Sequence, residues 1–303
     1  MGNSGVAADR PPCDGWDMTA TTSASELDAA YEGLSPTATA DFNRNGFAHL
    51  TGVLSPATIA EYEPTITAEV IRLNTQHLPL AERDTYHKAF LQVTNLWRQN
   101  DTVKRLVFSR RLAGIAAALL GVHAVRLYHD QALYKEPGGG ITPWHADQYY
   151  WPLSSDRCLT IWLPLQETPL EMGPLAFARG SHNFAYGRDL PISDESEARL
   201  KQAVAEQDFA DVVEPFALGD ASFHRGWTFH HAGPNHSDVP RRVMTVIYLD
   251  ADLRVAEPTN AQQTADRVWM PGTEIGQIPQ TPLNPVLYDS AAAPARSSGC
   301  SWR

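Results

Sequence analysis

The sequence contains no run of apolar residues that approaches the roughly 20 needed to span a membrane. It is also short of positive charge, because 24 Lys and Arg residues stand against 35 Asp and Glu residues, and the formal net charge is −11. A general binder of nucleic acid or of an anionic membrane needs a basic face, which this balance does not favour. We therefore expect a small-molecule partner, with no nucleic acid, no membrane and no obligate protein partner.

Cysteine is scarce as well. Cys13, Cys158 and Cys300 lie far apart in the chain and form no CxxC pair. This pattern is typical of a reduced cytosolic protein and argues against a disulfide scaffold. The N-terminal stretch lacks the basic, apolar and small-residue succession of a signal peptide. Together these absences predict a cytoplasmic location.

The chain does have enough material for a sizeable core, with 303 residues of which 43% are hydrophobic. Residues 1–24 and 288–303 are rich in small and polar residues, and we expect both to be flexible tails. Residues 25–287 are expected to form a single domain. Within it we predict a helical support at 25–121, a β core at 122–252 and a C-terminal segment at 253–287.

Capping signals predict the main helices. Ser55 is a candidate N-cap and Pro56 fits the first helical position of a long helix, although Pro64 should kink that helix or delay its start. Two further helices are predicted at 110–121 and at about 194–207. From residue 122 onward the segments are short, alternating and rich in β-formers, which is typical of an antiparallel sandwich or barrel. The predicted fold class is α+β with a mainly β core.

One short stretch, "TPWHADQYYWP" from Thr142 to Pro152, carries the first chemical signal. In an extended strand, residues i and i+2 point to the same side, so His145 and Asp147 can aim an imidazole and a carboxylate at one metal ion. Such a pair alone is weak evidence. Gln148 and Trp151 follow it and could supply a polar contact and an aromatic wall to a substrate pocket.

A second stretch from Gly219 to Arg242 offers candidates for a third ligand: His224, His230, His231 and His236. On one continuous strand, His224 and His230 would share a side and His231 would face the other way. The following turn would return the chain beside that strand and bring Arg241 nearby. Two histidines and one carboxylate leave three positions open on iron(II), and an arginine can bind a dicarboxylate through paired hydrogen bonds. The alternative to a metal site is that these residues are purely structural, as a core histidine, a capping aspartate and a solvated arginine.

Taken together, "TPWHADQ", "GPLAFARGSH" and "GDASFHRGWTFHHAGPNHSDVPRR" resemble the phytanoyl-CoA dioxygenase-like (PhyH) family of Fe(II)- and 2-oxoglutarate-dependent oxygenases, over residues 35–287. The resemblance implies a double-stranded β-helix, a cupin-like jelly-roll barrel with supporting N-terminal helices. It implies Fe(II), 2-oxoglutarate and O2 as cofactors. It also implies site residues, namely His145, Asp147 and His230 as iron ligands, Arg241 as the partner of the distal carboxylate of 2-oxoglutarate, and Gln131 and Trp162 as cosubstrate-pocket residues that could equally be structural.

One departure from the family pattern bears on the third ligand. The family often has His-Gly-Ser where this chain has His230-His231-Ala232, which makes His231 a rival ligand. His224 is expected to be structural. Asp147 disfavours halogenation, because related halogenases have a small residue at that position.

The resemblance implies hydroxylation of an unactivated C–H bond of a small molecule, with conversion of 2-oxoglutarate to succinate and CO2. The high usage of Ala and Arg is compatible with a role in secondary metabolism. Desaturation, epimerisation and oxidative cyclisation use the same cofactors and stay open as alternatives. A Zn or Mn isomerase or hydrolase and a non-catalytic binding protein are further alternatives, against which Arg241 argues. Candidate substrate contacts, each of which could be mere packing, are Gln148, Trp151, Phe229, Asn95 and Trp97.

Overall fold

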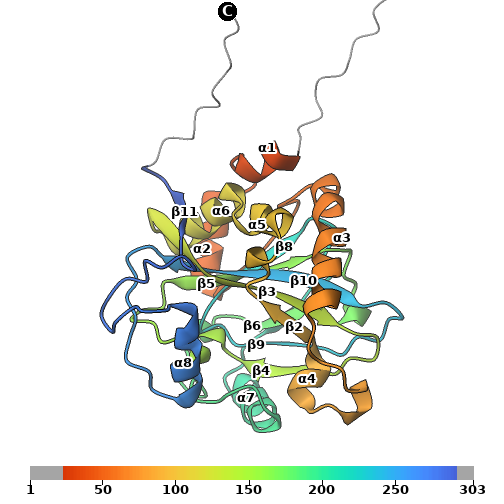
Figure 1. Ribbon diagram of the computed structural model, residues 1–303. Coiled ribbons are helices and arrows are strands. Elements are labelled where there is room, and N and C mark those ends of the chain that lie inside the picture. The colour runs from red at the N-terminus through yellow and green to blue at the C-terminus, as the bar shows by residue number, and fades with distance from the viewer. Residues whose placement is uncertain (1–22, 292–303) are drawn as a thin grey trace, which may run out of the picture.

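Two antiparallel β-sheets form the centre of the protein in this computed structural model, which describes residues 23–291 (Figure 1). The large sheet has the order β1 (Phe47–Leu50), β8 (Ala221–Arg225), β5 (Cys158–Pro164), β10 (Arg241–Asp250), β3 (Ala124–Lys135) and β11 (Val286–Asp289), with β2 (Leu91–Thr94) also paired to β3. The small sheet has the order β4 (Thr142–His145), β9 (His230–Ala232), β6 (Leu175–Ala178) and β7 (Asp211–Val213).

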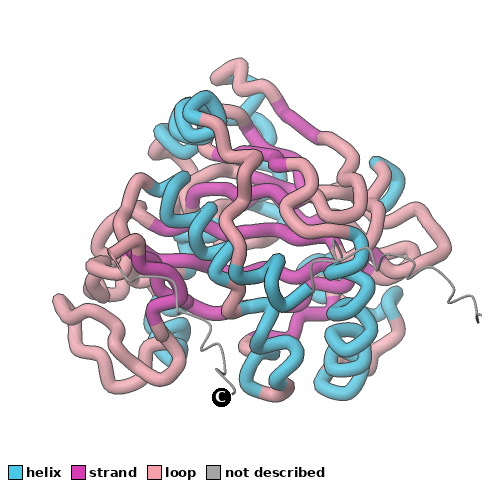
Figure 2. The backbone as a smooth tube through the Cα atoms, turned by 90° about the horizontal axis from the view of Figure 1, so that it is seen from above, coloured by secondary structure: helices cyan, strands magenta, loops and turns pink. Residues whose placement is uncertain are grey.

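Helices cover the outer face of the large sheet. They are α1 (Ser23–Asp28), α2 (Pro36–Asn45), α3 (Pro56–Leu73), α5 (Asp101–Val107) and α6 (Arg110–Leu120) (Figure 1). Figure 2 shows several helices crossing in front of the strands when the molecule is seen from above. The apolar sides of these helices and of the strands beneath them form the largest hydrophobic cluster. The predicted α+β class with a mainly β core is confirmed.

Further helices surround the small sheet and the sheet ends. They are α4 (Thr85–Ala89), α7 (Asp194–Glu206) and α8 (Ala261–Asp266), together with 3-10 turns at Leu80–Glu82, Leu96–Arg98, Asp147–Tyr150, Leu170–Met172, Ser181–Asn183 and Arg267–Trp269. Among the residues described, no helix combines the length and apolar character that a membrane crossing would require.

The long helix α3 begins where its capping signal predicted. The Ser55 hydroxyl accepts a hydrogen bond from the Thr58 amide at 3.2 Å, and Pro56 is the first helical residue. The helix continues unbroken through Pro64 to Leu73, so the expectation that Pro64 might delay its start was wrong. The lost amide bond is tolerated because four residues around this turn are buried against the core, namely Ile59, Tyr62, Ile66 and Val70.

Two expectations about chain path need correction. His224 and His230 do not lie on one strand, because the chain turns at Gly226 and Trp227 and passes from β8 in the large sheet to β9 in the small sheet. The next turn then carries the chain back to β10 in the large sheet, so β9 and β10 are not paired neighbours. The expected tail boundaries also shift, because α1 begins at Ser23 within the expected N-terminal tail and β11 extends to Asp289 within the expected C-terminal tail; residues 1–22 and 292–303 lie outside the described residues.

The loop before β6 packs closely against the β9–β10 turn, and a glycine makes this contact possible. Gly173 has a φ of +64°, and a Cβ there would lie 2.2 Å from the Gly233 carbonyl oxygen. Its own carbonyl accepts a hydrogen bond from the buried Arg241 side chain. The loop before β6 can therefore approach the β9–β10 turn closely only because residue 173 lacks a side chain.

Replacing Gly173 tests this close approach. Gly173→Ala should lower the free energy of unfolding by about 2–3 kcal/mol, because it adds a backbone clash to the left-handed strain of an L-residue. Gly272→Ala is the matched control, since Gly272 has a φ of +72° but no atom within 4 Å of the added Cβ. It should lose only about 1 kcal/mol. Urea unfolding followed by circular dichroism gives both values, and equal losses would contradict the contact.

Candidate active site

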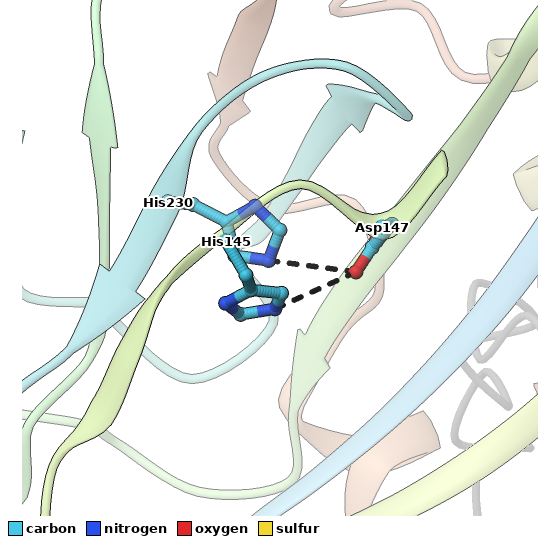
Figure 3. A group of neighbouring side chains, drawn as sticks. All are labelled: His145, Asp147 and His230. Atoms are coloured by element: carbon cyan, nitrogen blue, oxygen red, sulfur yellow. Dashed lines mark ion pairs between the residues drawn. The ribbon is translucent and has the colours of Figure 1, made fainter. Parts of the chain in front are cut away.

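Three side chains from the small sheet and from the turn that follows its strand β4 converge on one point (Figure 3). His145 ends β4, His230 begins β9, and the two are register partners in the small sheet. Asp147 follows one extended residue later, at the start of a 3-10 turn. Its Oδ1 atom lies 3.7 Å from Nε2 of His145 and 3.6 Å from Nε2 of His230. One ligand atom from each residue can thus lie within 4.8 Å of the others.

Backbone carbonyls set the orientation of both imidazoles. Nδ1 of His145 lies 2.7 Å from the Pro143 carbonyl oxygen, and Nδ1 of His230 lies 2.9 Å from that of Thr228. Nδ1–H is therefore the donor in each ring, and the Nε2 lone pair points to the shared centre. Burial lowers the pKa of both histidines, which favours the neutral imidazole that a metal ion requires.

The two oxygens of the Asp147 carboxylate contact different groups. Oδ2 accepts a hydrogen bond from the Thr160 hydroxyl at 2.8 Å and lies 3.1 Å from Nε2 of His224. Oδ1 is left facing the two imidazoles. Burial alone would raise the pKa of Asp147, but its interactions with His230, His224 and His145 hold that pKa below the usual value. Two neutral imidazoles and one carboxylate oxygen form a donor set that fits non-haem iron(II).

The rival ligand His231 faces away from this centre. Its ring stacks on Trp144 with a centroid distance of 4.1 Å, and its Nε2 lies 3.2 Å from Asp211. His224 lies next to the centre, as its ring is 4.6 Å from that of His230, and it contacts Asp147 on the far oxygen. The structure therefore gives His224 a positioning role and leaves His230 as the histidine that faces the metal centre.

Arg241 is a buried cation without a carboxylate partner among the described residues. It is 1% exposed, it donates to the Gly173 carbonyl, and its Nε has no hydrogen-bond partner. Its guanidinium lies 5.3 Å from the centre of the Trp162 ring, whose Nε1 is also without a partner. Burial lowers the pKa of Arg241 to about 9. Because a buried unpaired cation is costly, this end of the site fits an anionic ligand such as a 2-oxoglutarate carboxylate.

A cavity of about 330 Å³ lies between the sheets and joins Arg241 to the three metal-facing residues. Alternate residues of two neighbouring strands line it, as expected for strands that present one face inward. These residues include His129, Gln131 and Leu133 on β3, and Thr245 and Ile247 on β10.

The structure places seven of the eleven expected site residues around this cavity, namely His145, Asp147, His230, Arg241, Gln131, Trp162 and Trp151. The four others, all expected substrate contacts, lie outside it. The Gln148 amide donates to the Ser155 carbonyl, and Phe229 points to the side opposite its neighbour His230 and packs with Trp144. Asn95 accepts a hydrogen bond from the Trp97 indole, and Trp97 packs against the core beneath the helices.

Sequence reasoning missed several lining residues. Thr160 and His129 could have been found by strand alternation, because each lies two residues before an expected pocket residue. Tyr86, Asp266 and Trp269 carry no such signal, since they reach the cavity from short helical segments far away in the sequence.

The comparisons with known proteins agree with this geometry. The family model described as phytanoyl-CoA dioxygenase (PhyH) matches residues 42–243. A curated protein from Stutzerimonas stutzeri, named a probable alpha-ketoglutarate-dependent hypophosphite dioxygenase, is 27% identical over 172 residues, which is 54% of this chain and 59% of that protein. The alignments thus span about three fifths of the length of this relative and of a second one from Danio rerio.

Solved structures extend the likeness over more of the chain. The epimerase SnoN, solved with Fe3+, alpha ketoglutarate and nogalamycin RO, is 27% identical with a TM-score of 0.68, and the match covers 83% of this chain and 97% of SnoN. The carbocyclase SnoK is 24% identical with a TM-score of 0.70, covering 86% of this chain and 98% of SnoK, and it shows the shared fold.

These findings confirm the expected double-stranded β-helix, the oxidoreductase class, and iron and 2-oxoglutarate as cofactors. The family model spans well over half of the sequence and ends just beyond Arg241, so it includes every metal-facing residue described above. The chain belongs to the phytanoyl-CoA dioxygenase (PhyH) family.

Proposed function

We propose that this protein is an Fe(II)- and 2-oxoglutarate-dependent dioxygenase that hydroxylates an unactivated C–H bond of a small molecule, with O2 consumed and 2-oxoglutarate converted to succinate and CO2. The observation that carries the proposal is the buried, unpaired guanidinium of Arg241 in the same cavity as His145, Asp147 and His230. A zinc or manganese hydrolase and a passive binding protein have no need of such a cation, which supports the oxygenase over both.

The chain's own residues have separable tasks in this scheme. His145, Asp147 and His230 would hold the metal ion, and three protein ligands would leave it able to bind cosubstrate and oxygen. Arg241 neutralises the distal carboxylate of 2-oxoglutarate, and Trp162 beside it keeps that pair out of water, where it would be weaker. Thr160 and His224 keep Asp147 from turning its second oxygen to the metal. When bound, iron with 2-oxoglutarate supplies the oxidising power that breaks the substrate C–H bond.

Epimerisation or oxidative cyclisation is a second candidate outcome. The specific support is that two structures with TM-scores of 0.70 and 0.68 are named a carbocyclase and an epimerase of nogalamycin biosynthesis. Two of the curated relatives are named for hypophosphite and methylphosphonate, which are small oxyanions, and others are named phytanoyl-CoA dioxygenase domain-containing protein 1. Secondary metabolism, a cytoplasmic location and the lack of an obligate protein partner stay predictions. Product analysis by mass spectrometry separates hydroxylation, which adds one oxygen atom, from the other two outcomes.

The metal site can be tested by anaerobic addition of Fe(II) and 2-oxoglutarate to the purified protein. A weak charge-transfer absorption band near roughly 500 nm is expected when the 2-oxo acid chelates iron on the open face. His145→Ala should abolish the band, because one of only three protein ligands is lost. His231→Ala should retain it, since His231 faces Asp211. Iron binding without any band would contradict the cosubstrate assignment, and loss of the band in His231→Ala alone would contradict the ligand assignment.

The cosubstrate pocket can be tested by comparing two adjacent arginines. Arg241→Gln should weaken 2-oxoglutarate binding about 10- to 100-fold, since charge-assisted hydrogen bonds contribute about 1.5–3 kcal/mol. Arg242→Gln is the control, because Arg242 faces the other side of β10 and donates to Glu63 and Gln166. It should change the affinity less than about twofold. Titration of the absorption band gives both dissociation constants.

The stability of the ligand-free Arg241→Gln protein provides an independent check. Removal of an unpaired buried charge should leave the melting temperature unchanged or raise it, while 2-oxoglutarate should stabilise only the original protein. Equal stabilisation of both proteins by 2-oxoglutarate would contradict the role of Arg241.

A further inference from the structure

The cavity extends well beyond the site for cosubstrate and metal. Arg241 and Ile247 both line it from β10, and they lie six residue steps apart along the strand, which corresponds to roughly 20 Å. Thr160, which holds Asp147, is the register partner of Ile247 on β5. The metal-facing residues therefore lie away from Arg241 along the strand direction. The part of the cavity beyond them is free for the substrate.

Aromatic side chains form the walls of this distal part. They are Tyr150 and Trp151 at the 3-10 turn after Asp147, and Trp269 after α8, whose ring lies 5.6 Å from that of His129. Tyr86 and Phe90 line the cavity from α4, nearer the level of Arg241 along the strands. The hydroxyls of the two tyrosines are partly engaged, because Tyr86 donates to Gln92 and Tyr150 accepts from the Ile192 amide, which leaves the Tyr150 proton as one polar group in the wall. The walls therefore offer mainly ring faces and edges, which are suited to packing against a ring of the substrate.

The charges of the cavity are distributed unevenly. Two carboxylates line it, Asp147 and Asp266, whereas Arg241 is the single Lys or Arg side chain among the described lining residues. Asp147 faces the metal, and Arg241 serves the 2-oxo acid in the proposed function. An oxyanionic substrate would thus find no cation of its own in the distal part and would face Asp266 instead.

Asp266 is the last residue of α8 and lies beside Trp269. Its carboxylate accepts hydrogen bonds from the Tyr128 hydroxyl and the Trp269 side chain, both neutral donors, and no Lys, Arg or His among the described residues forms an ion pair with it. Burial raises its pKa to about 7, and the two hydrogen bonds offset only part of that effect. A cation from outside would compensate this carboxylate, and the neighbouring indole would favour a cation as well.

We propose that the distal part of the cavity is the binding site of a substrate that carries both a ring and a protonated amine. The ring packs between the aromatic walls, and the amine pairs with Asp266. This proposal rests on the proposed function, because it assumes that Arg241 is occupied by 2-oxoglutarate. It names the chemical class of the substrate, and it assigns Asp266 as a specificity-determining residue.

Three probes that share one ring test the proposal. Tryptamine carries a cation, tryptophol is neutral and indole-3-propionate is an anion. Each is titrated by calorimetry at pH 8 under anaerobic conditions into protein already loaded with Fe(II) and 2-oxoglutarate. Tryptamine should bind at least about fivefold more tightly than tryptophol, and indole-3-propionate should bind most weakly. Equal affinities, tightest binding of indole-3-propionate, or no binding of any probe would overturn the proposal.

Variants of Asp266 test whether this residue causes the preference for tryptamine over tryptophol. Asp266→Asn should remove the advantage of tryptamine while tryptophol binds within about twofold of its original affinity, and Asp266→Glu should retain the advantage. Asp238→Asn is the control, because Asp238 is exposed on the β9–β10 turn. Retention of the tryptamine advantage in Asp266→Asn would overturn the assignment of Asp266. If that variant does not fold, the ranking of the three probes on the original protein decides the substrate class.

The absorption band measured in the same samples separates this proposal from the one on which it rests. A normal band and normal 2-oxoglutarate affinity together with no preference for tryptamine would overturn only the substrate class. No 2-oxoglutarate binding at all would overturn the proposed function first.

Discussion

The carboxylate of Asp147 joins the two sheets of the barrel. One of its oxygens faces His145 and His230 of the small sheet, and the other is held by Thr160 and His224 of the large sheet. The metal-facing arrangement therefore depends on the spacing between the sheets and not on a single loop. A carboxylate fixed on one side by two donors has little freedom to rotate, so it presents one oxygen as a ligand without an ordering cost when the metal binds.

The interior of this barrel holds charges that its own residues do not neutralise. Arg241 and its register partner Lys135 lie side by side, and Lys135 donates to the backbone carbonyls of Gly140 and Gly233 and to the Thr142 hydroxyl, none of which is charged. Burial lowers the pKa of both side chains, so their positive charge carries a free-energy cost in the ligand-free protein. Ligands of opposite charge offset that cost. Binding of an anion therefore removes a free-energy cost that the free protein carries, which raises the affinity of the site for anions over neutral ligands.

The sequence was informative where the chemistry follows strand alternation. His145 and Asp147 flank one extended residue, and the parity argument correctly separated His230 from His231. The same argument assumed a single strand from His224 onward, which was wrong, because a turn moves the chain from one sheet to the other. His224 still reaches Asp147, since facing sheets both direct inward residues at the same space. Phe229, an expected substrate contact, lies outside the cavity that His230 lines, because adjacent residues of an extended segment point to opposite sides.

The cavity-lining residues that could not be predicted from the sequence have a structural feature in common. Tyr86, Trp269 and Asp266 come from short helical segments whose positions depend on packing against the finished barrel, so no local period connects them to the metal-binding motif. The division has a functional consequence. Strands carry His145, His230 and Arg241, and Asp147 follows shortly after β4, whereas helical turns and loops form the wall where we propose that the substrate binds. A barrel of this kind can therefore keep one oxidative chemistry while the composition of that wall determines which molecule, and which of its C–H bonds, comes next to the metal.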